Sequence, residues 1–253
     1  MTVAFLPAAL YALQNIAALQ AYQNLDALTF NVLNQTKTLS AALCCYLVMG
    51  RKQSFVQVLS LFLLLLSALI MERVIALDSL FSQNIPVKVP EWGSKHWMHG
   101  VAPIMLASFI SGLSGAISQK SLQTLGGVGR DPYLFSMELC AASALILGLS
   151  LLVSPDGKQI AKQGFWHGWT GLTWIPIITN SIGGIIVGLV TKYAGSVRKG
   201  FALIFGILIS GLVQAWAQPD IGVTKEQIVG GVVAAISLWM HASYPHVPKQ
   251  KRD

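Results

Sequence analysis

The chain has 253 residues, of which 54% are hydrophobic and only 11% are charged, and its mean hydropathy is +0.61. Because soluble domains carry roughly 25% charged residues, this composition excludes an ordinary soluble fold and indicates an integral membrane protein. The formal net charge of +7 collects in the loops on one side of the predicted membrane spans. It therefore reflects topology and contact with anionic headgroups rather than nucleic-acid binding.

Eight stretches are long and apolar enough to span a bilayer, which needs about 20 residues. The first and the sixth are the least hydrophobic, because amide and hydroxyl side chains interrupt them. The pattern predicts an all-α polytopic membrane protein. In chain order the predicted spans cover residues 3–22, 27–48, 54–76, 99–119, 132–153, 170–190, 200–217 and 227–244.

The distribution of lysine and arginine predicts the orientation of these spans. With the N-terminus in the cytoplasm, ten of these residues lie in cytoplasmic segments and six lie in segments on the other side. The positive-inside rule then places both termini in the cytoplasm and makes residues 78–98 a lumenal loop. No cleavable signal peptide is evident, since the chain runs from Met1 almost directly into an apolar span.

Residue types that carry enzymatic chemistry form no catalytic pattern. The cysteines, Cys44, Cys45 and Cys140, lie inside predicted spans, so they predict no disulfide framework. The histidines lack the spacing of metal ligands, and the glycine-rich segment 126–130 lacks the preceding strand of a phosphate-binding loop. We expect no enzyme activity, cofactor or metal, and a function that resides among the helices.

Lys37 stands in the middle of the second predicted span, where a lysine costs about 2.5 to 3.5 kcal/mol to insert. Such a residue marks a substrate path or a buried ion pair, for which Glu138 is the acidic candidate. Gly183 and Gly184 are expected to let helices pack closely. Together these features predict a carrier or channel with an anion-attracting cavity. Further polar residues at membrane depth are Asn15, Asn31, Asn34, Gln35, Ser136, Asn180 and Ser181.

Two blocks carry a family resemblance. The segment "LYALQNIAALQAYQNLDALTFNVLNQTKTLSAAL" resembles the third and fourth helices of nucleotide-sugar transporters of the CMP-sialate and UDP-galactose type. The segments "GFWHGWTGLTW" and "SIGGIIVGLVTKYAGSVRKGFALIF" resemble their eighth and ninth helices. The similarity runs in the same order over nearly the whole chain.

The resemblance implies a fold of ten helices in two inverted five-helix repeats around a central site. Since the chain begins at a segment that resembles the third helix, we expect two helices of the first repeat to be missing and transport to be weak or absent. Residues 1–77 then correspond to the remainder of the first repeat and residues 99–244 to the second. Residues 245–253 form a cytoplasmic tail.

The resemblance also implies which residues contact substrate. Lys37 and Lys199 match the essential lysines of the fourth and ninth helices, and Asn15 matches an asparagine of the third. Four other positions depart from the residues common in the family, which implies a different preference for the sugar or nucleobase. The expected substrate-binding residues are Asn15, Phe30, Asn31, Asn34, Gln35, Lys37, Ser136, Glu138, Cys140 and Lys199.

The function implied is the exchange of a cytosolic UDP-sugar for lumenal UMP. Among UDP-sugars, the UDP-N-acetylhexosamines are favoured as substrates. Two alternatives stay open: a drug or metabolite exporter of the same superfamily, and an inactive truncated form. The partners implied are a nucleotide sugar, a nucleoside monophosphate, membrane lipids and a second copy of the chain in a homodimer, with no nucleic acid.

The C-terminal sequence "KQKRD" bears on location. It places Lys249 and Lys251 as in the di-lysine signal that returns membrane proteins to the endoplasmic reticulum. A solvated basic tail near anionic lipid is the alternative. The expected location is a Golgi or endoplasmic reticulum membrane.

Overall fold

The computed structural model describes residues 2–25, 27–71, 97–123, 129–217 and 225–245. Within these ranges the regular structure is helical and includes no strand, which confirms the predicted all-α class. The elements are α1 (Thr2–Asn24), α2 (Ala27–Gln35), α3 (Lys37–Met49), α4 (Phe55–Met71), η1 (Trp97–Val101), α7 (Ala102–Leu122), α8 (Pro132–Leu151), α9 (Pro155–Gln163), η2 (Gly171–Thr173), α10 (Trp174–Tyr193), α11 (Ser196–Ala217) and α12 (Lys225–Ser243).

Each of the eight predicted spans overlaps a described helix, and residues 72–76 of the third span lie outside the described residues. By length and composition, four described segments suffice to cross a membrane: Ala4–Asn24, Trp97–Leu122, Pro132–Leu151 and Gly171–Tyr193. Phe55–Met71 is a shorter apolar helix. Large apolar side chains of α8 and α10, such as Leu147 and Ile185, are exposed. These exposed apolar faces are typical of contact with lipid rather than with water.

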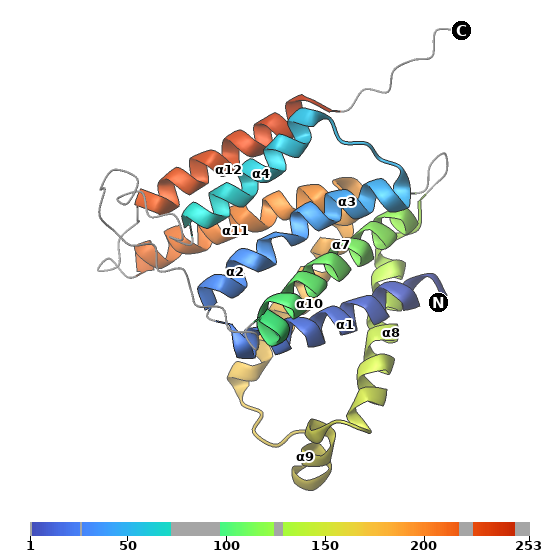
Figure 1. Cartoon of the computed structure of the whole chain (residues 1–253). Coiled ribbons are helices and arrows are strands. Elements are labelled where there is room, and N and C mark those ends of the chain that lie inside the picture. The colour runs from blue at the N-terminus through green and yellow to red at the C-terminus, as the bar shows by residue number, and fades with distance from the viewer. Residues whose placement is uncertain (1, 26, 72–96, 124–128, 218–224, 246–253) are drawn as a thin grey trace.

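The helices form a bundle in which α3 occupies a central position. Helix α3 packs against α7 on one side and α11 on the other, while α4 and α12 lie side by side at one edge (Figure 1). Helix α1 runs along α7 and α8 at the opposite side. The largest buried cluster joins α3, α4, α11 and α12 around Phe201 and Ile204. The elements that carry Lys37 and Lys199 are thereby held against each other.

Polar side chains on one face of α4 join this helix to α12. Ser54 Oγ donates to the Tyr244 carbonyl at 2.7 Å and Ser67 Oγ donates to the Gly230 carbonyl at 2.8 Å. Between these ends, Gln57 Nε2 donates to the His241 carbonyl at 3.3 Å. Ser237 Oγ donates to the Ser60 carbonyl, and Ser60 Oγ lies 3.1 Å from His241 Nδ1. We call this set of contacts the α4–α12 seam.

Helices α3 and α7 approach each other closely at Gly112. A Cβ atom at Gly112 would lie 2.5 Å from the carbonyl carbon of Ser40, so a larger residue cannot fit unless the helices separate. The expectation that Gly183 and Gly184 serve such close contacts is wrong. A Cβ atom at either position would meet no described atom within 4 Å, because both glycines lie on the outward part of α10.

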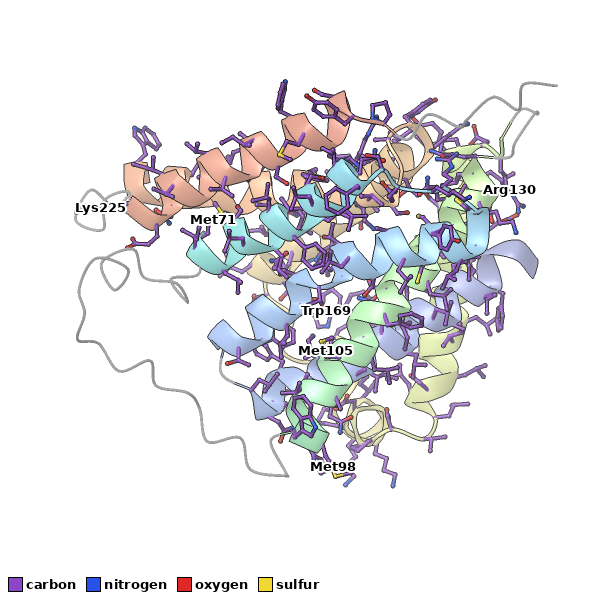
Figure 2. The ribbon with its side chains drawn as sticks, turned by 45° about the horizontal axis from the view of Figure 1, so that its top comes forward. Met71, Met98, Met105, Arg130, Trp169 and Lys225 are labelled. Atoms are coloured by element: carbon purple, nitrogen blue, oxygen red, sulfur yellow. The ribbon has the colours of Figure 1, made fainter. Side chains whose placement is uncertain are left out.

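Helix α8 begins at a strong capping site. The Asp131 side chain accepts hydrogen bonds from the backbone amides of Tyr133 and Leu134, each at 2.9 Å, and Pro132 occupies the first turn. Both features favour a helix start at this point. In Figure 2, Arg130 lies at the end of the bundle opposite to Met71 and Lys225. The chain therefore alternates between the two ends of the bundle, as a polytopic topology requires.

The sequence pattern missed α9, a short amphipathic helix without buried residues. After it, the rings of Phe165, Trp166, Trp169 and Trp174 form a cluster in which the Trp166 and Trp169 centroids lie 4.7 Å apart. Aromatic rings of this kind favour the membrane–water interface. The predicted lumenal loop up to residue 96, and Lys249 and Lys251 of the tail, lie outside the described residues. The division into two repeats stays a prediction.

Candidate functional site

The second predicted span is divided into two helices at Thr36, directly before Lys37. The Thr36 hydroxyl donates to the Leu33 carbonyl at 2.6 Å, and the Thr36 amide donates to the same carbonyl at 3.1 Å. These bonds to the residue three positions earlier tighten the last turn of α2 and end it. Lys37 is consequently the first residue of α3, at a break inside the bundle. Thr36 keeps right-handed helical backbone angles (φ −61°, ψ −15°), so the interruption is a single tight turn between α2 and α3.

Lys37 and Lys199 approach each other where α3 meets α11. A Cβ atom at Gly200 would lie 2.5 Å from the Thr38 hydroxyl oxygen, so the two helices touch at the residues that follow the two lysines. The Lys199 ammonium exerts a Coulombic repulsion on that of Lys37. Two like charges are costly in a medium of low dielectric, and an anion bound beside them relieves the repulsion. The arrangement is suited to binding phosphate groups.

Glu138 has a different cationic partner from the one considered on the sequence. Its Oε1 atom lies 2.5 Å from Arg130 Nη2, and both side chains belong to the start of α8 and the segment before it. The structure therefore supports Arg130, not Lys37, as the ion-pair partner of Glu138. This removes the main argument for a purely structural role of Lys37.

The other expected substrate residues are distributed over several faces. Gln35 is buried between α4 and α11, where it lies beside Leu61 and Ile204. Phe30 packs against α1, with its ring 5.2 Å from that of Tyr22 in an edge-to-face arrangement. The remaining described positions are the half-buried Asn34, Ser136 and Glu138 and the exposed Asn15 and Cys140. The side chain of Asn31 lies outside the described set.

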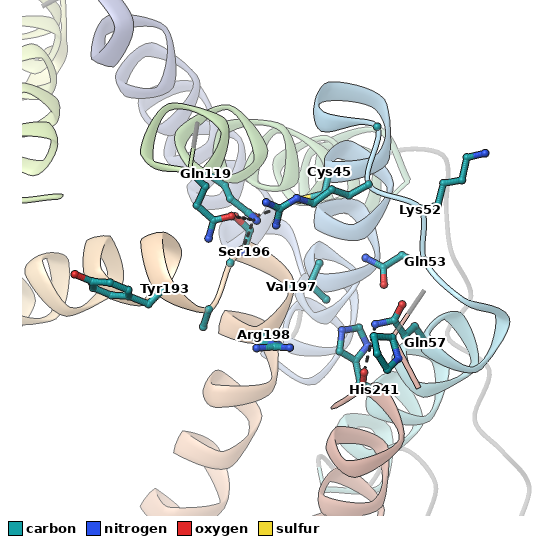
Figure 3. Close-up of a pocket in the computed structure, with 16 residues that line it drawn as sticks. Cys45, Lys52, Gln53, Gln57, Gln119, Tyr193, Ser196, Val197, Arg198 and His241 are labelled. Carbon is teal, nitrogen blue, oxygen red and sulfur yellow. Dashed lines mark hydrogen bonds between the residues drawn. The ribbon is translucent and has the colours of Figure 1, made fainter. Parts of the chain in front are cut away.

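A cavity of about 1040 Å³ opens at the end of the bundle where α3 ends and α11 begins (Figure 3). None of the ten expected substrate residues lines this cavity. Its walls come from α3 and the following segment, α4, α7, the α10–α11 turn, α11 and α12. The residues are Cys45, Gly50, Arg51, Lys52, Gln53, Gln57, Gln119, Gln123, Tyr193, Ala194, Gly195, Ser196, Val197, Arg198, His241 and Pro245.

Gln119 is the centre of a hydrogen-bond network in the wall of this cavity. Its Oε1 atom accepts from the Ser196 amide at 2.8 Å and from Cys45 Sγ at 3.4 Å. Its Nε2 atom donates to Gln123 Oε1 at 2.9 Å, and Gln123 in turn donates to the Thr191 carbonyl at 3.1 Å. The network fastens the start of α11 to the end of α7. It therefore fixes the position of the first turn of α11, which carries Lys199.

Sequence reasoning missed the residues that line the cavity. In the sequence, Arg51 and Arg198 are basic loop residues that indicate only the orientation of the spans. Gln119 is the last residue of the predicted span 99–119. Polar residues at helix ends usually face water, so their pattern does not distinguish a cavity wall from a solvated surface. Within the described ranges, no cluster of three or more His, Cys, Asp or Glu residues could hold a metal ion.

A family model with the description "Nucleotide-sugar transporter" matches residues 2–242. The chain belongs to the nucleotide-sugar transporter family. A UDP-N-acetylglucosamine transporter of Arabidopsis thaliana is 36% identical over 252 residues, which cover 100% of this chain and 74% of that protein. A rat UDP-N-acetylglucosamine transporter is 28% identical over 240 residues, or 95% of this chain and 70% of that protein. A mouse UDP-galactose translocator is 31% identical over 204 residues, or 81% of this chain and 49% of that protein.

Family membership gives the lysine pair its chemical context. A nucleotide sugar carries one or two phosphate groups, and ammonium groups on flexible stems are suited to hold phosphate oxygens through charge-assisted hydrogen bonds. Lys37 and Lys199 come from helices on two sides of the same contact. Transport requires no bond to be made or broken, and no catalytic group is needed.

Proposed function

We propose that this nucleotide-sugar transporter exchanges a cytosolic UDP-sugar for lumenal UMP, with a UDP-N-acetylhexosamine as the preferred substrate. The observation that carries the proposal is the approach of Lys37 and Lys199 at the contact between Thr38 and Gly200. The names of the Arabidopsis and rat relatives support the choice of sugar. We further propose that the protein resides in a Golgi or endoplasmic reticulum membrane with both termini in the cytoplasm.

The ion pair between Glu138 and Arg130 supports the same function indirectly. Because Glu138 is engaged at the start of α8, the positive charge of Lys37 is left to interact with substrate. In this proposal Gln35 and Asn34, which precede Lys37 on α2, bind polar groups of the nucleotide near the phosphates. In this proposal the phosphate end of the ligand lies at the α3–α11 contact.

Reconstituted exchange provides the test. Purified protein is placed in vesicles loaded with UMP, and uptake of labelled UDP-N-acetylglucosamine is compared with uptake of UDP-galactose and CMP-sialate. The proposal expects uptake that depends on internal UMP and is lost in Lys37→Ala and Lys199→Ala. Transport of neutral or cationic metabolites without competition by UMP would instead identify an exporter of another substrate class.

A further inference from the structure

Two arginines stand at the mouth of the cavity, separate from the lysine pair. Arg51 follows Gly50, the residue that caps the end of α3, and Arg198 lies in the first turn of α11. The charge of Arg51 acts on Cys45 and that of Arg198 acts on His241. Arg51, in the segment after α3, and Arg198, on α11, both line the cavity, and Figure 3 labels Arg198.

The charged side chains of the cavity wall are all positive. Among its sixteen lining residues there is no aspartate or glutamate. In the part of the chain that the structure describes, neither Arg51 nor Arg198 forms an ion pair. The start of α11 also opens into the cavity at Ser196, and a helix N-terminus adds partial positive charge. A cleft lined by one sign of charge focuses the field and concentrates ions of the opposite sign.

The arginines lie nearer to the mouth than the lysines. Lys37 precedes Cys45, which lines the cavity, by eight residues of α3, or about 12 Å along the helix. Lys199 follows Arg198 on α11 but, unlike Arg198, does not line the cavity. An anion that enters through this cavity consequently meets Arg51 and Arg198 before it meets the lysine pair.

We propose that Arg51 and Arg198 form a second anion site, which captures the diphosphate of the incoming nucleotide sugar before its transfer to Lys37 and Lys199. This inference rests on the proposed function. Guanidinium groups bind phosphate oxygens in a bidentate manner, and the amides of Gln53 and Gln57 in the same wall supply further donors. A volume of about 1040 Å³ is sufficient for a small-molecule ligand. The phosphate of an anionic lipid headgroup is the rival source of the same chemistry.

Uptake kinetics in vesicles of zwitterionic lipid separate capture from transport. Arg51→Gln and Arg198→Gln are each expected to raise the KM for UDP-N-acetylglucosamine about fivefold, and the double variant about 25-fold, with Vmax unchanged within about twofold. The dependence of KM on salt between about 0.05 and 0.5 M should also become weaker in the double variant. Lys120→Gln is the matched control, since it removes one positive charge from an exposed side chain near the end of α7 that does not line the cavity.

Two kinetic outcomes would overturn the inference while leaving the proposed function intact. One is a wild-type KM in the double variant of Arg51 and Arg198. The other is an equal rise of KM in Lys120→Gln, because that would show a general effect of surface charge. If the arginine variants alter uptake only in vesicles that contain anionic lipid, the site binds a lipid headgroup and substrate capture is excluded.

A binding measurement tests the mouth site independently of transport. Inorganic pyrophosphate is titrated by calorimetry into the Lys37→Ala, Lys199→Ala protein in zwitterionic nanodiscs. Residual binding that disappears when Arg51→Gln and Arg198→Gln are added supports the mouth site, even if the wild-type chain exchanges no UDP-sugar. The site is ruled out if the two lysine substitutions alone remove all pyrophosphate binding. It is also ruled out if the arginine substitutions leave the residual binding unchanged.

Discussion

Replacement of Lys37 by alanine should weaken nucleotide binding strongly without destabilising the fold. Lys37 and Lys199 repel each other where α3 and α11 meet. At an effective dielectric constant of about 20, two unit charges roughly 8 Å apart repel each other by about 2 kcal/mol, which sets the order of magnitude. Removal of one charge relieves this repulsion, and the unliganded protein should therefore be as stable as the wild type or more stable.

The loss of ligand affinity in Lys37→Ala has an expected size. A hydrogen bond to a charged group contributes about 1.5–3 kcal/mol, which corresponds to a reduction of UMP affinity of roughly 10- to 150-fold. Lys199→Ala should behave alike, because both lysines bind the same anion. Lys37→Arg keeps the charge but changes its shape and reach, so it should recover binding only in part.

The assay combines UMP titration and thermal unfolding in one detergent. Wild-type protein at a UMP concentration of about 100 times its Kd should gain about 2.7 kcal/mol of apparent stability, and the lysine variants should gain much less. A permanent ion pair with Glu138 would give the opposite pattern. Lys37→Ala would then lose about 3–5 kcal/mol and Glu138→Gln would rescue it. That result, or unchanged UMP affinity in both single lysine variants, would refute the reasoning.

Two further predictions concern contacts that hold α7 in place. Gly112→Ala should lower the free energy of unfolding by about 1–3 kcal/mol, because the new methyl group would lie 2.5 Å from the backbone of Ser40. Gly148→Ala on α8 is the control. Its methyl group would meet no described atom within 4 Å, so this variant should be neutral or slightly stabilising. Gln119→Leu should cost about 1–3 kcal/mol and raise the KM for nucleotide sugar, since the Ser196 amide loses its acceptor and the first turn of α11 loses its anchor.

Thermal unfolding and uptake kinetics check both predictions. Ser121→Ala serves as the control for Gln119, because its hydroxyl bonds only to the Ile117 carbonyl within α7. If Gln119→Leu unfolds at the wild-type temperature, the network does not anchor α11. Equal effects of Gly112→Ala and Gly148→Ala would show that the approach of α3 to α7 is not tightly constrained.

The spans were predictable because a bilayer imposes a minimum apolar length, and that length is visible in sequence. The division at Thr36 was not, since a threonine inside a span is ordinary and only its bond to the Leu33 carbonyl ends α2. Lys37 stood out because its charge is costly in the membrane. Arg51 and Arg198 did not stand out, because arginines at helix ends are expected in any cytoplasmic loop.

Pairing between distant segments was also hidden from the sequence. The partner of Glu138 depends on the turn that brings Arg130 back over α8, and hydrophobic pattern carries no information about that turn. Contacts of Gly183 and Gly184 could not be predicted from the sequence either. Glycines in a span allow close approach, but the position of the neighbouring helix decides whether it occurs, and in this protein it occurs at Gly112 and Gly200.

The α4–α12 seam has a consequence for how the protein moves. Its hydrogen bonds run from Ser54 and Tyr244 at one end to Ser67 and Gly230 at the other. At Ser67, which does not line the cavity, hydrocarbon offers no water to replace such a bond once it is broken. Separation of the two helices is therefore costly, and we expect α4 and α12 to move as one unit at the edge of the bundle in any rearrangement that transport involves.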